Sequence, residues 1–323
     1  MPNRTLCVAP MMDWTNRHCR YFMRLISPNA LLYTEMVTAH ALLNSPSSRL
    51  LAFSDFEQPV ALQLGGANPE DLAVASKIGA DYGYSEINLN VGCPSDRVQS
   101  GQFGACLMKT PKIVADCVAA MSNQVKIPVT VKTRLGVDHD DSYEFLAEFI
   151  STVASAGVNT FIVHARKAWL SGLSPKQNRS VPPLDYSKVI RLKEDFPELE
   201  IIINGGISTI AEVMPMLQRL DGVMLGRAAY HNPKLLEECE QHIFNQSLKL
   251  DYNKVIHDYC EYMREQMQLG VRIKVLLKPI FGLFHASHGA KTWRRSLTAY
   301  SQIETFNIDD LQTIAQQLIC SCE

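Results

Sequence analysis

Short apolar runs alternate with segments of helical periodicity along roughly the first three quarters of the chain. The runs are typical of buried strands, and the segments between them carry apolar residues three or four positions apart. The predicted strands lie at residues 5–9, 31–34, 60–64, 87–89, 128–131, 161–163, 201–203 and 223–225. Helices are predicted near residues 16–26, 142–156, 185–195 and 208–219, with two more beginning at Pro69 and just after Pro111.

Eight strand and helix units over about 240 residues are typical of a closed (β/α)8 TIM barrel. An open, doubly wound parallel sheet is the alternative. The barrel is favoured because polar or glycine residues follow nearly every predicted strand, and barrel proteins build their sites from the loops at that end.

The strand and helix alternation stops near residue 245, and the pattern then becomes entirely helical. Two amphipathic helices are predicted in this part of the chain. One has an apolar face of Val255, Tyr259, Tyr262 and Met263, and the other has one of Leu311, Ile314, Ala315 and Leu318. We therefore predict a barrel over residues 1–245 and a small all-helical domain over residues 246–323.

Composition excludes several classes of protein. The chain has 323 residues, of which 46% are hydrophobic, and no apolar run approaches the roughly 18 residues of a membrane helix. Residues 1–5 do not have the character of a signal peptide, and the nine cysteines show no Cys-x-x-Cys spacing. We expect a cytoplasmic protein with reduced thiols, no membrane partner, no obligate protein partner and no metal, since His285 and His288 have no carboxylate or thiol close in sequence.

The overall charge does not indicate a nucleic-acid partner, but its distribution does. There are 31 basic and 33 acidic residues, yet residues 266–302 contain six basic residues and no acidic one. Trp293 lies beside Arg294 and Arg295 in this window, and basic residues interleaved with aromatic ones suit RNA. The alternative is a solvated helix face over an aromatic core.

A cysteine follows the fourth predicted strand. Ile87 and Leu89 lie on one face of that strand, and the sequence Gly92-Cys93-Pro94 then ends it, because proline cannot continue a strand ladder. A thiol on a loop held by a rigid strand is positioned for chemistry. The alternative is a small buried residue in a turn.

Glycines and cations follow several other strands. Asn204-Gly205-Gly206 and Gly226-Arg227 come after the seventh and eighth strands, where many barrels bind phosphate through backbone N–H groups and a nearby cation. Taken alone, these glycines are equally typical of ordinary turns.

Three further polar residues end predicted strands. Lys132 could face the pyrimidine edge of a flavin, Gln63 can both donate and accept a hydrogen bond at such an edge, and His164 could donate to a phosphate or a substrate. The alternatives are a solvated lysine and a core histidine. The connection at residues 167–184 is long for a loop, and loops of that length are usually functional or disordered.

In combination, these motifs resemble the tRNA-dihydrouridine synthase family. The resemblance rests on Ala9-Pro10-Met11-Met12-Asp13, Gln63-Leu64-Gly65-Gly66, Asn88-Leu89-Asn90-Val91-Gly92-Cys93-Pro94-Ser95, Val131-Lys132-Thr133-Arg134, Val163-His164-Ala165-Arg166, Asn204-Gly205-Gly206 and Gly226-Arg227, in that order. The segment from His164 to Lys176 further resembles the bacterial A-type subfamily, which acts on positions 20 and 20a of the tRNA D-loop.

The resemblance implies FMN at the barrel mouth, with NADPH, or NADH, as reductant. It assigns the cofactor to Pro10, Met11, Met12, Gln63, Lys132, His164, Asn204, Gly205, Gly206, Gly226 and Arg227. Hydride from reduced FMN would reach C6 of uracil, and Cys93 would give a proton to C5, since a thiol of ordinary pKa, about 8.5, is mostly protonated at neutral pH.

It also implies that folded tRNA is the partner. Asn90 would hydrogen-bond the uracil, and Arg134 and Arg166 would face substrate or phosphate. The other predicted tRNA contacts are Lys176, Gln177, Arg179, Lys291, Thr292, Arg294 and Arg295. Two alternatives stay open at this point: a flavin barrel that acts on a free pyrimidine, as dihydroorotate dehydrogenases do, and a non-catalytic RNA-binding protein.

Overall fold

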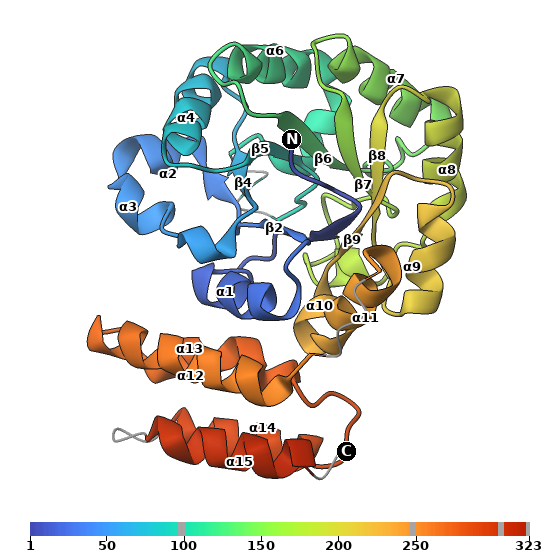
Figure 1. Ribbon diagram of the computed structural model, residues 1–323. Coiled ribbons are helices and arrows are strands. Elements are labelled where there is room, and N and C mark those ends of the chain that lie inside the picture. Colours follow the sequence, from blue (N-terminus) through green and yellow to red (C-terminus); the bar gives the residue numbers. More distant parts are fainter. Residues whose placement is uncertain (96–97, 99–100, 246–249, 303–306, 321–323) are drawn as a thin grey trace.

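The computed structural model describes residues 1–95, 98, 101–245, 250–302 and 307–320 (Figure 1). Its barrel strands are β1 (Leu6–Val8), β2 (Leu31–Tyr33), β4 (Val60–Gly65), β5 (Glu86–Val91), β6 (Val129–Arg134), β7 (Thr160–His164), β8 (Glu200–Asn204) and β9 (Gly222–Leu225). They pair in parallel, and the contacts of β1 with β9 and of β2 with β4 close the ring. The predicted (β/α)8 barrel is confirmed, and the open sheet is excluded.

Helices surround this ring. They are α1 (Arg17–Ile26), α2 (Ala39–Asn44), α3 (Ser47–Leu50), α4 (Pro69–Asp81), α6 (Pro111–Ser122), α7 (Tyr143–Ala154), α8 (Tyr186–Asp195), α9 (Ile210–Leu217), α10 (Arg227–His231) and α11 (Lys234–Ile243). Local signals explain several of their starts: Asn16 accepts hydrogen bonds from the first turn of α1, and Asn68 caps α4 just before its first residue, Pro69. The sequence pattern did not predict α2, α3, α10 or α11.

Short elements complete the barrel domain. β3 (Val37–Thr38) pairs with the end of β4, so it extends the line of β2 beyond a short break. The 3-10 helices are η1 (Asp55–Glu57), η2 (Gly104–Lys109) and η3 (Gln177–Arg179), and η4 (Lys278–Gly282) lies in the helical part of the chain. η3 lies inside the long connection at residues 167–184, so that connection has structure of its own.

The hydrophobic core has two parts. A small cluster fills the inside of the barrel, and it comprises Cys7, Ala9, Leu31, Tyr33, Ala61, Ile162, Ile202 and Met224. The larger cluster lies between the strands and the surrounding helices and continues into the C-terminal helices. The barrel interior is therefore a packed core rather than an open channel.

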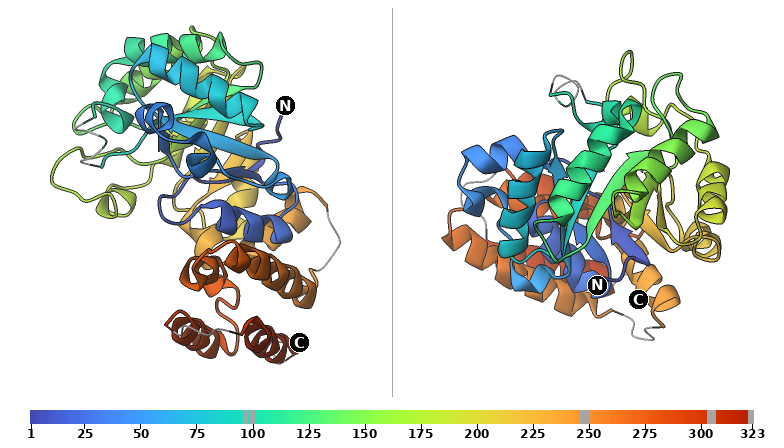
Figure 2. Two further views of the ribbon diagram at one scale, coloured as in Figure 1. Left: turned by 90° about the vertical axis from the view of Figure 1, so that its left-hand side faces the viewer. Right: turned by 90° about the horizontal axis from the view of Figure 1, so that it is seen from above.

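The C-terminal helices form two layers beside the barrel. They are α12 (Tyr252–Gln268), α13 (Ile273–Leu277), α14 (Ala290–Tyr300) and α15 (Ile308–Cys320). Figures 1 and 2 show α12 and α13 next to α1, with α14 and α15 on their far side. The predicted domain boundary adjoins residues 246–249, which lie outside the described residues, so it stays a prediction.

Aromatic contacts hold the helical layers against α1. Tyr21 stacks on Tyr262 with ring centroids 3.8 Å apart, and the rings of Phe22 and Tyr259 meet edge to face. His18 Nδ1 and Tyr262 Oη are 2.7 Å apart. The helical layers are thus attached through a packed interface. No helix in the described ranges is both long and apolar enough to cross a membrane.

Candidate active site

The carboxyl ends of the parallel strands bring the predicted site residues to one rim. Gln63, Asn90, Lys132, His164 and Asn204 all lie at or near the last residue of their strands. Two direct contacts join them: Asn90 Nδ2 donates to Gln63 Oε1 at 2.8 Å, and Lys132 Nζ donates to Asn204 Oδ1 at 3.0 Å. Asn90 is opposite Lys132 in the strand register, and His164 is opposite Asn204, so the five residues form one cluster.

Cys93 lies on a loop that its neighbours hold firmly. Asn90 Oδ1 accepts hydrogen bonds from the backbone N–H groups of Gly92 and Cys93, at 3.0 and 2.9 Å. The Cys93 thiol is partly exposed, and its Sγ lies 3.4 Å from Ser95 Oγ. This placement differs from the fully buried turn residue that was the alternative. The Asn90 oxygen shapes the loop, and its predicted contact with uracil stays a prediction.

Cations crowd this rim. Burial, with Arg134 nearby, lowers the pKa of Lys132 to about 7. Burial and the surrounding cations also lower the pKa of His164 well below its usual value, so its ring is neutral at pH 7. No described carboxylate forms an ion pair with Lys132, Arg166 or Arg227. The rim therefore favours an anion.

The turn after β8 has a backbone that glycine alone adopts easily. Gly205 has φ +116° and Gly206 has φ +75°. A Cβ atom on Gly205 would lie 2.7 Å from the His164 ring, and one on Gly206 would lie 2.5 Å from Leu184. The backbone at this turn therefore has close neighbours that a larger residue would displace.

Two arginines lie close to this turn. Arg166 donates to the Pro182 carbonyl, while its Nε is buried and without a partner among the described residues. Arg227 donates to the Arg179 carbonyl at 3.1 Å. A buried donor that lacks a partner costs free energy unless a ligand or water accepts from it. Glycine backbone with nearby guanidinium groups fits a phosphate.

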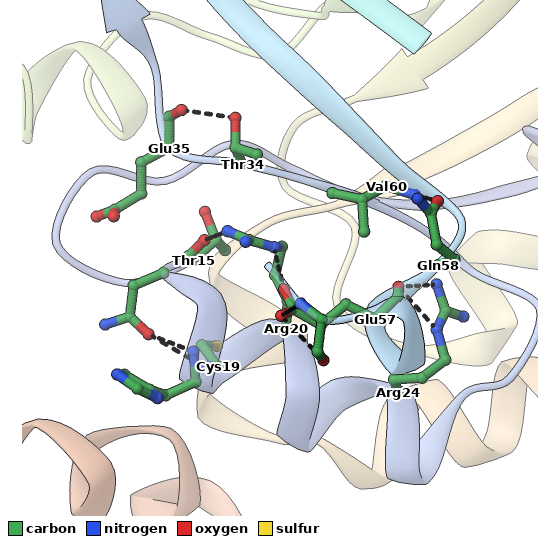
Figure 3. Close-up of polar contacts among 12 residues, drawn as sticks. Thr15, Cys19, Arg20, Arg24, Thr34, Glu35, Glu57, Gln58 and Val60 are labelled. Atoms are coloured by element: carbon green, nitrogen blue, oxygen red, sulfur yellow. Dashed lines mark hydrogen bonds and ion pairs between the residues drawn. The ribbon is translucent and has the colours of Figure 1, made fainter. Parts of the chain in front are cut away.

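The loop after β1 is anchored through Thr15 to an ion pair that was not predicted from the sequence. Arg20 pairs with Glu57 at 2.9 Å and donates to the Thr15 carbonyl at 2.8 Å (Figure 3). Thr15 Oγ1 in turn accepts from Met11 N–H at 2.9 Å. The predicted cofactor residues Pro10, Met11 and Met12 are therefore on an ordered loop, and Met12 is 57% exposed.

The long connection at residues 167–184, which we call the insert, is tied to the rim. Asn178 is fully buried and holds the insert by accepting from Trp169 N–H at 2.7 Å. Arg134 donates to the carbonyls of Gly92, Lys167 and Asn178, at 2.8, 3.1 and 3.0 Å. The resemblance implied that Arg134 faces substrate or phosphate, and in the structure its guanidinium donates to these three protein carbonyls. A substrate contact of Arg134 stays a prediction.

The cations predicted on the helical domain are exposed on α14. Lys291, Arg294 and Arg295 line an open groove of about 540 Å³ together with Thr298, Ala299 and Gln302. Trp293 differs from them: it is fully buried, and its Nε1 donates to the Ile280 carbonyl at 2.8 Å. The aromatic-core alternative therefore applies to Trp293, while the cations beside it remain available to a ligand.

Comparison with known proteins identifies relatives of this chain. The model of the dihydrouridine synthase family matches residues 7–319. The tRNA-dihydrouridine(20/20a) synthase of Vibrio cholerae is 54% identical over 91% of this chain and 90% of its own, and that of Escherichia coli is 53% identical over 92% and 90%. Among solved structures, morphinone reductase matches with a TM-score of 0.49 and 12% identity over 77% of this chain and 88% of its own.

Proposed function

The chain belongs to the dihydrouridine synthase family, and we propose that it reduces the C5–C6 double bond of uridine to 5,6-dihydrouridine at positions 20 and 20a of the tRNA D-loop. The observation that carries this proposal is the partly exposed Cys93 thiol, held at a cationic barrel rim by Asn90. In this proposal the rim has two roles: it binds a flavin, and it delivers a proton.

The rim residues fit FMN. Gln63 and Lys132 would supply the hydrogen bonds and the cation that the polar edge of the ring needs, and the loop of Pro10, Met11 and Met12 would bound the ring. The glycine turn after β8, Gly226, Arg166 and Arg227 would hold the phosphate, next to His164 and Asn204. Bound FMN, reduced by NADPH, would supply the hydride that C6 of uracil accepts.

Cys93 is the proton donor in this proposal. Hydride addition at C6 leaves an enolate whose C5 must take a proton, and the thiol releases one as its S–H bond breaks. Solvent then returns the proton to sulfur.

The folded tRNA would lie across the insert and the helical domain. A buried site requires the target base to leave its stack, so the enzyme needs a strong grip on the phosphate backbone. Arg179 of the insert contacts Arg227 through its carbonyl, and Lys176 and Gln177 precede it in the same segment. Lys291, Thr292, Arg294 and Arg295 are exposed on α14. A tRNA substrate also places the activity in the cytoplasm.

The central test replaces the thiol. Purified protein should be yellow, and with NADPH it should convert unmodified tRNA, which mass spectrometry detects as a gain of two mass units at the D-loop. Cys93→Ala should retain its flavin and its NADPH oxidation but reduce uridine about 10²–10⁴-fold more slowly. Equal rates for both proteins would remove Cys93 from the mechanism.

The same assay separates the two alternatives. Reduction of free uracil or orotate without tRNA would indicate a free-pyrimidine enzyme, and colourless protein that still binds tRNA would indicate a non-catalytic RNA-binding protein. A double variant, Arg294→Ala with Arg295→Ala, should raise KM for tRNA and lower its salt slope by about 2. The matched control is Lys77→Ala with Lys126→Ala, which removes two exposed cations elsewhere on the barrel.

A further inference from the structure

Strand β5 carries polar side chains at every second position, and all of them are buried. Glu86, Asn88 and Asn90 alternate with apolar residues along the strand, and their exposed fractions are 0%, 0% and 9%. Successive side chains of a strand point to opposite faces. These three side chains therefore share one face, and the contacts below place that face inside the barrel.

A continuous chain of hydrogen bonds connects them across three strands. Cys93 N–H donates to Asn90 Oδ1 at 2.9 Å, and Asn90 Nδ2 donates to Gln63 Oε1 at 2.8 Å. Gln63 Nε2 donates to Asn88 Oδ1 at 2.8 Å. Asn88 Nδ2 then donates to Thr130 Oγ1 at 2.8 Å, and Thr130 Oγ1 donates to Glu86 Oε1 at 2.6 Å.

The chemistry of both ends fixes the direction of this chain. At the amino end of β5, the Glu86 carboxylate can only accept, and it also takes hydrogen bonds from Tyr33 Oη at 2.7 Å and Arg4 Nε at 2.6 Å. At the rim, the backbone N–H groups of Gly92 and Cys93 can only donate. Every amide and hydroxyl between these ends must therefore donate towards Glu86, so none can rotate without breaking a bond.

We propose that this chain is a positioning device for the Cys93 loop. Glu86, Thr130 and Asn88 would act as positioning residues, because they orient Gln63 and the Asn90 carboxamide that holds the loop. The inference deepens the proposed function, since a proton donor must lie within hydrogen-bond reach of the carbon it protonates, and small misplacements are costly to rate. A barrel interior made only of apolar residues would pack as well but would leave Asn90 Nδ2 without its acceptor, Gln63 Oε1.

The same chain would couple the two halves of the proposed reaction. Gln63 lies in the middle of it and is also the proposed hydrogen-bonding partner of the flavin ring. Its donor and acceptor are set by Asn88 on one side and Asn90 on the other. Loss of a hydrogen bond near Glu86 should therefore disturb both the proposed flavin contact of Gln63 and the loop of Cys93. Neither residue bonds directly to Glu86 or Thr130.

The test removes the hydroxyl of Thr130, the link farthest from Cys93 that can be replaced by a side chain of the same shape. Thr130→Val removes one buried hydroxyl and keeps the side-chain shape, and Thr130→Ser restores the hydroxyl. The matched control is Thr160→Val, because Thr160 also donates to a carboxylate, Glu200, at 2.7 Å and is 6% exposed, but it is not a link between Glu86 and the rim.

The main measurement is the rate at which iodoacetamide alkylates Cys93 in the flavin-loaded protein, followed by peptide mass spectrometry. Thr130→Val should raise this rate about fivefold or more, as expected when one hydrogen bond of the chain is lost. It should also lower kcat for tRNA by a similar factor with little change in KM. Thr130→Ser and Thr160→Val should stay within about twofold of the parent protein in both measurements.

The outcomes separate this inference from the proposed function. If Thr130→Val and Thr160→Val alkylate alike, the positioning role is wrong, even if the parent protein reduces tRNA. If alkylation responds to Thr130→Val while the parent protein reduces no uridine, the positioning role stands and the proposed function is wrong. Should Thr130→Val fail to fold, Asn88→Leu breaks the chain one link nearer the rim and is read in the same way.

Discussion

The two sides of the barrel interior have opposite chemistry. Strands β1, β2, β7, β8 and β9 fill their side largely with apolar residues, among them Cys7, Leu31, Ile162, Ile202 and Met224. Strands β4, β5 and β6 fill theirs largely with polar residues, namely Gln63, Glu86, Asn88, Asn90, Thr130 and Lys132. Apart from Lys132, which is half-buried, the residues named on both sides are buried, so water access does not explain the difference.

The two sides have different roles: the apolar side stabilises the barrel, and the polar side orients the groups of the proposed active site. Apolar side chains stabilise a barrel by leaving water, and their exact identity matters little if volume is conserved. Buried polar side chains stabilise it only when every donor and acceptor is paired. The fold does not require this complete pairing of buried donors and acceptors. Its consequence is that the groups at the rim have a fixed orientation.

The largest expected effect on the free energy of unfolding comes from Glu86→Leu, which replaces a carboxylate of the polar side with an apolar side chain. Removal of the carboxylate leaves Arg4, Tyr33 and Thr130 without a shared partner, and such a loss typically destabilises by about 3–5 kcal/mol. Urea unfolding at pH 7 measures the difference. A variant as stable as the parent protein would show that the polar side tolerates the loss of a hydrogen-bond partner as well as the apolar side tolerates a substitution. Glu200→Gln, at a partly exposed carboxylate that also contacts Arg4, is the milder control.

An intermediate effect, of opposite sign, is expected for Lys132→Met in the flavin-free protein. The pKa of Lys132 is about 7 when folded and about 10.5 when unfolded. Between these pH values the unfolded chain binds more protons, so stability rises with pH. The cost of the buried charge is complete below pH 7 and vanishes towards pH 10.5.

The variant should therefore be more stable than the parent protein by about 1–2 kcal/mol at pH 6, and the gain should shrink as the pH approaches 10. Its flavin content should fall, since the cation of the proposed ring contact is lost. Unfolding curves at several pH values and the flavin absorbance give both results. A gain that grows with pH would contradict the sign, and Lys126→Met, at an exposed lysine, serves as the control.

The smallest effect is expected on the apolar side. Ile202→Val removes one buried methylene group and should cost about 0.5–1.5 kcal/mol of stability. The alkylation rate of Cys93 should not change, because Ile202 makes no contact in the polar chain. If Ile202→Val altered that rate as much as Thr130→Val does, the distinction between the two sides would fail.

The architecture could be predicted because its signals are local. Each strand is a short apolar run, each helix has its own periodicity, and the parallel barrel places every strand end at one rim. That rule was enough to bring Gln63, Cys93, Lys132 and Asn204 together. The alternation of Glu86, Asn88 and Asn90 was also visible in the sequence, and it would have indicated a polar side of the interior.

Other features depend on partners far apart in the chain, and local patterns do not reveal them. His18 and Tyr262 are separated by 244 positions, and Arg20 and Glu57 by 37. Trp293 lies among cations in the sequence but is buried in the structure, because a helix turns neighbouring residues to different faces. The three backbone carbonyls that accept from Arg134 were likewise not visible in the sequence, because two of them belong to the insert.

The packed joint between α1 and α12 has one more consequence. The helical layers contact α1 through Tyr21 and Tyr262, while Arg20 of the same helix holds the loop of Met11 at the rim. One helix, α1, therefore contacts both the layers that carry the proposed RNA-binding cations and the loop that would bound the flavin. If tRNA binds to α14 as proposed, a uridine would be selected by its distance from the phosphates held there rather than by its neighbouring bases.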